Sequence, residues 1–138
     1  MSYKKITNMK NLLLLIVLLL STQAFSQQWI DDSNFDDKIY KNEQCIDCIV
    51  VVEFWVEFNK VNAFKEWNLI KGAKYFRVDI SKSPKSKKEY RVRMAPTLII
   101  FKDGIIEEMF KASLDLECPI DLEELQEAIE DIKKADRF

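Results

Sequence analysis

The sequence predicts an α/β fold in which one mixed central sheet is flanked by helices on both faces, behind an N-terminal signal peptide. Three observations support this prediction. Segments with strand and helix patterns alternate along the chain. An Asp-Gly turn joins the last two predicted strands, which makes that pair antiparallel. Removing 26 of the 138 residues leaves 112, enough for one compact domain and too few for two.

The first residues have the three parts of a secretory signal. Lysines near the start precede the unbroken apolar run Leu12–Leu20, and Ala24-Phe25-Ser26 offers small residues at a cleavage site. The run has nine residues, about half of the ~20 that span a bilayer. We therefore expect residues 1–26 to be a cleaved signal peptide and residues 27–138 to be a periplasmic or secreted domain without a membrane span.

Composition narrows the function classes. The leader holds three of the 21 basic residues and none of the 23 acidic ones, so its removal takes the formal charge from −2 to −5. An acidic domain is a poor candidate for binding nucleic acid. The chain has no histidine, which removes the commonest general base and the commonest zinc ligand. We expect no metal and no cofactor.

The first half of the domain begins with a short strand at residues 28–30. A helix follows at residues 33–42, with Ser33 as its N-cap. Residues 48–56 are almost all β-branched or aromatic, which is typical of a strand buried on both faces. Residues 59–70 are predicted to be a helix, because their large apolar side chains are spaced for one face.

The second half repeats the alternation. Residues 73–80 form a strand, and Ser83-Pro84 opens a lysine-rich helix that ends near residue 90. Strands at residues 97–101 and 105–110 flank the turn Lys102-Asp103-Gly104. Asp121, with Glu124 three residues later, caps a last helix that carries one apolar stripe.

Three stretches in register give the chain a family resemblance. They are Val52-Glu53-Phe54-Trp55-Val56-Glu57-Phe58, Ala95-Pro96-Thr97-Leu98 and Phe101-Lys102-Asp103-Gly104. In these, and in their order and spacing, residues 28–135 resemble the thioredoxin family. The resemblance implies a thioredoxin-like sheet, a cis-proline at Pro96 and a β-hairpin turn at the third stretch.

The departure from the family lies at its redox motif. The family's tryptophan-cysteine-glycine-proline-cysteine falls on residues 58–62, where both cysteine positions are asparagine, Asn59 and Asn62. The first cysteine owes its reactivity to a helix N-terminus that lowers its pKa, and the second resolves the mixed disulfide. An asparagine amide does neither, although it caps a helix well. We expect no catalytic residue at this position, only a helix cap at Asn59 or Asn62.

The resemblance also implies a binding groove and a buried acid. Phe58, Asn59, Ala95 and Pro96 fall on the family's peptide-binding groove, where the backbone at Ala95 would pair with an extended polypeptide. Glu53 falls on the family's buried carboxylate, which here has no cysteine to serve. We interpret Glu53 as a paired acid retained for structure.

The cysteines leave two alternatives open for the pair Cys45 and Cys48, and three for Cys118. Cys45 and Cys48 form a CxxC that precedes a strand, at the end opposite to Asn59 and about 25 Å from it for a strand of that length. The pair is either a structural disulfide, as expected in an oxidising compartment, or a relocated redox pair. Cys118 is a buried apolar residue, a free thiol or a mixed-disulfide site.

Three functions remain at this stage. The first is a redox-inactive module that binds an extended polypeptide or a protein partner in the cell envelope. The second is a thiol–disulfide oxidoreductase that uses Cys45 and Cys48. The third is a site at which Cys118 alone forms a mixed disulfide with glutathione or a protein.

Overall fold

The computed structural model describes residues 9–14, 28–40 and 48–135. Residues 9–14 are helical with exposed side chains. The predicted signal peptide otherwise lies outside the described residues and stays a prediction. Within the described part of the chain, no helix has both the length and the apolar character needed to cross a membrane.

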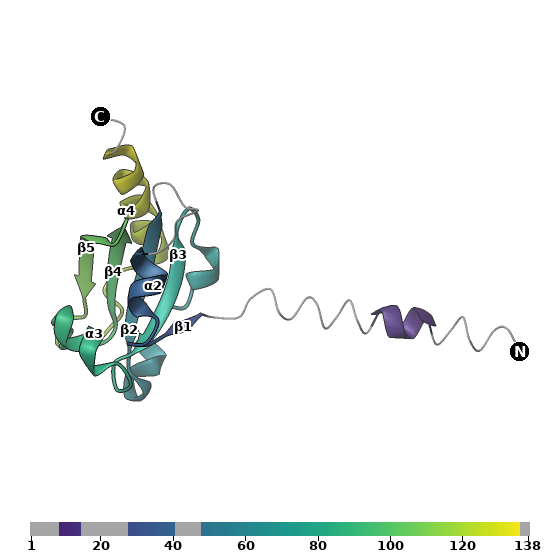
Figure 1. Ribbon diagram of the computed structural model, residues 1–138, viewed down its shortest axis with the longest axis horizontal. Coiled ribbons are helices and arrows are strands. Elements are labelled where there is room, and N and C mark those ends of the chain that lie inside the picture. Colours follow the sequence, from purple (N-terminus) through teal and green to yellow (C-terminus); the bar gives the residue numbers. More distant parts are fainter. Residues whose placement is uncertain (1–8, 15–27, 41–47, 136–138) are drawn as a thin grey trace, which may run out of the picture.

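One five-stranded mixed sheet organises the domain (Figure 1). Its strands, in spatial order, are β1 (Trp29–Ile30), β3 (Lys74–Asp79), β2 (Ile49–Trp55), β4 (Thr97–Lys102) and β5 (Ile105–Lys111). β1, β3 and β2 run parallel, whereas β2 with β4 and β4 with β5 pair antiparallel. These strands confirm the sequence predictions to within two residues at each end.

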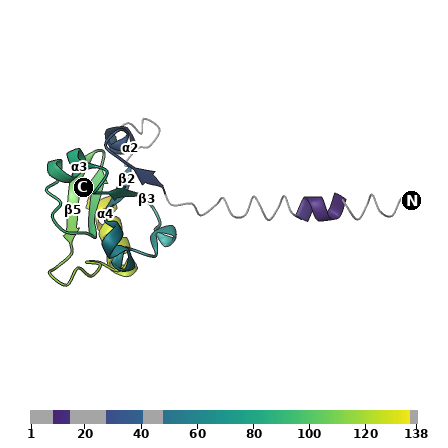
Figure 2. The ribbon, with the colours of Figure 1, turned by 90° about the horizontal axis from the view of Figure 1, so that it is seen from below.

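Helices cover both faces of the sheet. α2 (Phe35–Tyr40) and α3 (Pro84–Glu89) lie on one face, and α4 (Leu122–Ala135) lies on the other, as Figure 2 shows. β2 is buried on both faces because its successive side chains enter two different cores. Val50, Val52 and Phe54 face α2, whereas Ile49 and Val51 face α4.

Two predicted local signals are confirmed. The β4–β5 turn places Asp103 at φ 51° and Gly104 at φ 80°, the left-handed values that a tight hairpin turn needs. α4 is capped as expected, since the Glu124 N–H donates to Asp121 Oδ1 at 2.8 Å. Leu125 and Ile129 form the buried stripe of this helix.

The predicted cap at Ser33 was wrong. α2 begins at Phe35, and Ser33 instead donates its N–H to Asp31 Oδ1 at 2.9 Å in a turn before the helix. Asp32, the residue before Ser33, caps a different helix. Its carboxylate accepts the backbone N–H groups of Lys85 at 2.9 Å and Ser86 at 2.8 Å at the start of α3.

The predicted helix at residues 59–70 was also wrong. Two short 3-10 segments, η2 (Glu57–Asn62) and η3 (Trp67–Leu69), stand in its place. The cause is a buried ion pair below the segment: Phe64 N–H donates to Glu53 Oε1 at 3.0 Å, and Arg77 donates to the Phe64 carbonyl at 2.9 Å. Because these side chains take the backbone groups that an α-helix would pair internally, no α-helix forms.

Candidate functional site

The candidate site lies where the carboxyl end of β2 meets the start of β4. The pairing of Phe54 with Thr97 sets these two ends side by side. The loop before β4 contains a cis peptide bond between Ala95 and Pro96. η2 follows β2 directly and carries Phe58, Asn59 and the second asparagine of the motif. The structure therefore brings together the residues predicted to form the groove.

The amide of Asn59 ties two loops together. Its Nδ2 donates to the Ala95 carbonyl at 2.8 Å and to the Leu116 carbonyl at 2.9 Å, and its Oδ1 accepts from Asn62 Nδ2 at 2.8 Å. Asn59 is 9% exposed, so these bonds are largely shielded from water. The expectation that Asn59 or Asn62 caps an α-helix was wrong, because no α-helix begins here and the 3-10 segment has no side-chain cap.

This arrangement changes what the groove offers a ligand. Ala95 is 5% exposed, and its carbonyl already accepts a hydrogen bond from Asn59. A peptide N–H that paired with the same carbonyl would have to share it with Asn59, because a carbonyl oxygen has two lone pairs. The Ala95 carbonyl is thus half engaged and almost buried, so side chains on the surrounding loops are the more accessible contacts for a polypeptide.

Large apolar side chains are exposed on the loops that Asn59 joins. Phe58 is 80% exposed, Val61 69% and Leu114 89%. Phe58 and Val61 belong to η2 beside Asn59, and Leu114 lies two residues before Leu116 in the loop after β5. Because Asn59 joins the two loops, these exposed side chains form a candidate surface for contact with another molecule.

Glu53 lies beneath the site at the centre of a polar cluster. It is fully buried, and its Oε1 accepts from Tyr75 Oη at 2.5 Å, from Phe64 N at 3.0 Å and from Arg77 Nη2 at 3.2 Å. Arg77 has 9% of its side chain exposed. Arg77 therefore donates to Glu53 inside the protein, and both side chains bind the backbone of Phe64 in the segment that follows η2.

Burial governs the ionisation of this cluster. Desolvation raises the pKa of Glu53 above its usual 4.5, against the opposing charge of Arg77 and the hydrogen bond from Tyr75. Desolvation likewise raises the pKa of Tyr75, and the neighbouring Glu53 adds to that effect. Tyr75 therefore stays a neutral donor. Besides fixing the backbone at Phe64, the charge of Glu53 acts on the Cys118 thiol, where it adds to the effect of burial in raising the pKa.

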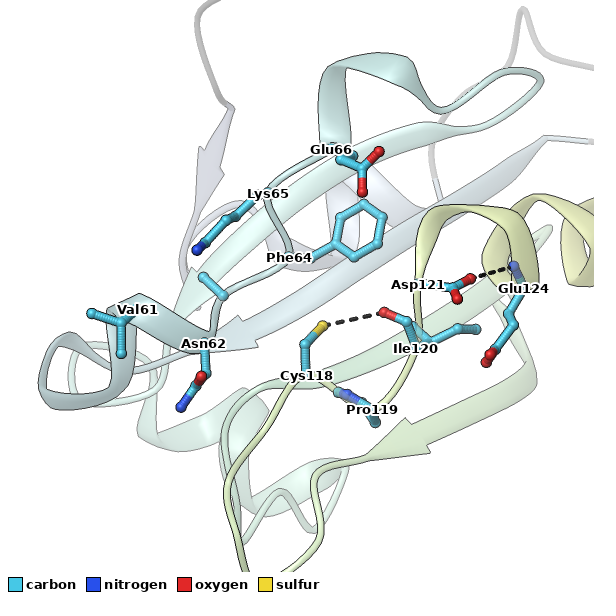
Figure 3. Close-up of a pocket in the computed structure, with 11 residues that line it drawn as sticks. Val61, Asn62, Phe64, Lys65, Glu66, Cys118, Pro119, Ile120, Asp121 and Glu124 are labelled. Atoms are coloured by element: carbon cyan, nitrogen blue, oxygen red, sulfur yellow. Dashed lines mark hydrogen bonds between the residues drawn. The ribbon is translucent and has the colours of Figure 1, made fainter.

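A pocket of about 450 Å³ opens beside η2 and contains the free thiol of Cys118. In Figure 3 the segment from Val61 to Glu66 forms one wall, and Cys118 to Glu124 form the other. The thiol donates to the Ile120 carbonyl at 3.3 Å. Burial raises the pKa of Cys118 above its usual 9.0, so little of the reactive thiolate is present at neutral pH.

The CxxC lies away from this site. Cys45 is outside the described residues, and its pairing with Cys48 stays a prediction. Cys48 is 7% exposed, and its carbonyl accepts from the Asp103 N–H at 3.2 Å in the β4–β5 turn. That turn and Pro96 stand at opposite ends of β4, so Cys48 is at the far end of the sheet from Pro96. Among the described residues, no group of cysteine and acidic side chains is arranged to hold a metal ion.

Two features of the site were missed by the sequence prediction. The Leu116 carbonyl takes part in the Asn59 cluster, and Leu116 adopts φ 59° to present it. Tyr75 on β3 is the other member of the Glu53 cluster that was missed, because in the sequence it looks like an ordinary apolar strand residue. The alternation of Tyr75 and Arg77 on one face of β3 is the signal that places both beside Glu53.

The chain matches no family model, and it matches none of the curated proteins.

Proposed function

We propose that this protein is an exported member of the thioredoxin-like group that has lost electron exchange and serves as a polypeptide-binding or assembly module in the cell envelope. The strand order, the cis bond before Pro96 and the Asp-Gly hairpin support the thioredoxin-like assignment. The signal-like first residues support export.

The observation that carries this proposal is the bonding of Asn59. Its amide stands where the family places the nucleophilic thiol, and it is held by the Ala95 and Leu116 carbonyls. An amide in that position neither attacks a disulfide nor stores electrons. It does fix the geometry of two loops that present Phe58 and Leu114 to solvent. The site thus keeps a contact surface and lacks the two cysteines of the family's redox motif, while the Cys118 thiol lies in the pocket beside it.

The contacts proposed for the partner are mainly those of side chains. Because Ala95 is almost buried, whereas Phe58 and Leu114 are largely exposed, the apolar side chains of η2 and of the loop after β5 supply most of the contact area. Burying a Phe or a Leu side chain contributes about 1.5–3 kcal/mol. A few such contacts account for a moderate affinity without a covalent step.

The alternative is a thiol–disulfide oxidoreductase that uses Cys45 and Cys48. Cys48 directly precedes β2 and does not lie at a helix N-terminus, the position that activates the first cysteine of the family's redox motif. It also lies at the end of the sheet opposite to Pro96, which would separate such a redox pair from the groove.

Site-specific photocrosslinking in the envelope tests the proposal. A photoreactive residue replaces Phe58, and the matched control replaces Ile105, which is also exposed, at 66%, but lies next to the hairpin turn at the other end of β4. We expect discrete crosslinked species from position 58 and none of the same size from position 105. The same products from both positions, or none from position 58, would overturn the proposal.

A further inference from the structure

A second pocket lies beside the loop before β4, which contains the cis bond between Ala95 and Pro96. It has a volume of about 320 Å³ and is lined by Arg91, Arg93, Met94, Lys111 and Ala112. Met94 directly precedes Ala95, and the Ala112 N–H donates to the Pro96 carbonyl at 3.2 Å. The pocket therefore adjoins the proposed contact surface, on the side where α3 ends beside β5 (Figure 1).

The pocket is strongly basic. Arg91, Arg93 and Lys111 are all exposed, and no acidic residue lines the pocket with them. Among the residues that the structure describes, none of the three forms an ion pair. The whole chain has a formal charge of −2, so this is a local positive region on an acidic protein. Like charges that share one pocket repel, and an anionic ligand relieves that repulsion.

The backbone at Arg91 supports a role for its side chain. Arg91 follows the end of α3 with φ 53°, and the hydrogen bonds Arg91 N–H to Lys88 O, 3.2 Å, and Val92 N–H to Lys87 O, 3.0 Å, close the helix. This left-handed position strongly favours glycine. An arginine there makes the helix end less stable than a glycine would, while it adds a guanidinium to the pocket.

We propose that this basic pocket selects acidic residues in the polypeptide that lies across the contact surface at Phe58 and Leu114. The inference rests on the proposed function and adds the partner's chemistry: an extended segment with apolar residues followed by Asp or Glu. The planar guanidinium groups of Arg91 and Arg93 match carboxylates in a two-point geometry, and Lys111 adds a point charge. A nucleic acid fits less well, since three cations on an acidic domain neutralise few phosphates.

Peptide binding measured by fluorescence anisotropy tests this selection. The probes are labelled peptides with two leucines followed by a run of glutamates, and matched peptides in which glutamine or lysine replaces every glutamate. We expect the glutamate peptide to bind at least about tenfold more tightly than the glutamine peptide, and this advantage to shrink as salt rises. The lysine peptide should bind most weakly. Equal binding of all three would overturn the selection and leave the proposed function standing, whereas no binding of any peptide would count against both.

Variants locate the selection in the pocket. The triple variant Arg91→Gln, Arg93→Gln, Lys111→Gln should remove the preference for glutamate and keep the binding of the glutamine peptide. The matched control Lys85→Gln, Lys87→Gln, Lys88→Gln removes the same charge from exposed positions on α3, and it should keep the preference. Equal loss in both triple variants would show a long-range charge effect and overturn the proposal. Competition by inorganic phosphate as strong as by the glutamate peptide would also overturn it.

Arg91→Gly separates binding from folding. Glycine suits the left-handed backbone at this position, so the variant should unfold at a higher temperature than the natural protein. Its affinity for the glutamate peptide should fall severalfold at the same time, while its affinity for the glutamine peptide stays unchanged. A stabilised variant with an unchanged preference for glutamate would remove Arg91 from the proposed pocket.

Discussion

Replacing Asn59 by alanine should destabilise the protein far more than a typical surface substitution. The change removes two hydrogen bonds to backbone carbonyls, 2.8 and 2.9 Å long, and one of the carbonyls belongs to Ala95, which is 5% exposed. Each lost bond costs about 1 kcal/mol, and the buried Ala95 carbonyl left without its donor adds a similar amount. We therefore expect the free energy of unfolding to fall by about 3 kcal/mol.

Urea unfolding, followed by tryptophan fluorescence, measures this loss. For a domain of this size, 3 kcal/mol lowers the midpoint by roughly 2 M. The matched control is Asn62→Ala, which removes only the bond from Asn62 to Asn59 at 2.8 Å and should cost about 1 kcal/mol or less. Asn59→Asp has the same shape but no donor, and it should be at least as damaging as alanine at neutral pH. If Asn59→Ala costs no more than Asn62→Ala, the amide does not join the two loops as described.

Three further predictions address the residues around the site. Burial raises the pKa of Glu53 above 4.5, so the folded state binds this proton more tightly than the unfolded chain does. The stabilisation by the protonated Glu53 is present below about pH 4.5 and is lost as pH rises through the raised pKa. Urea unfolding of the natural protein should therefore show a pH dependence that the Glu53→Gln variant lacks. Parallel curves of unfolding free energy against pH for the two proteins would contradict this. Asp32→Ala should lower the free energy of unfolding by about 1–2 kcal/mol, because Lys85 and Ser86 at the start of α3 lose their acceptor, whereas Asp131→Ala on the exposed side of α4 should be near neutral. In a Cys45→Ser, Cys48→Ser background, the Cys118 thiol should react with a disulfide reagent with an apparent pKa above 9.0; a lower value would mean that the thiol is activated.

The strands were predictable because their evidence is local. β2 and β4 are mostly apolar, and mostly apolar segments of this length are typical of strands buried on both faces. The turn at Asp103 and Gly104 was equally clear, since few residues adopt its left-handed backbone. The stripe of α4 and its cap at Asp121 also follow from neighbouring residues. Each of these features is encoded within a few positions of itself.

The segment after β2 could not be predicted, because its conformation is decided by distant residues. Phe64 has the spacing of a helix face, and it does reach the core, but Glu53 and Arg77 take its backbone N–H and carbonyl. Those partners lie 11 and 13 residues away in the sequence. A helix pattern carries no information about such competition.

The candidate site was half predictable for the same reason. The asparagines at positions 59 and 62 are visible in the sequence, but the backbone partners of Asn59 are 36 and 57 residues away. The basic pocket likewise combines residues from the end of α3 and the end of β5. The sequence shows that asparagine stands at positions 59 and 62, and the tertiary contacts show that Asn59 joins two loops.

The most direct test of the account is the reduction of insulin driven by dithiothreitol, measured for the natural protein and for its Cys45→Ser, Cys48→Ser variant. We predict that both proceed at the rate of buffer alone, because in the proposed thioredoxin-like assignment the Asn59 amide stands where a reactive thiol would be. A clear rate for the natural protein that disappears in the variant would show that the CxxC exchanges electrons, and it would contradict the proposal of a redox-inactive binding module.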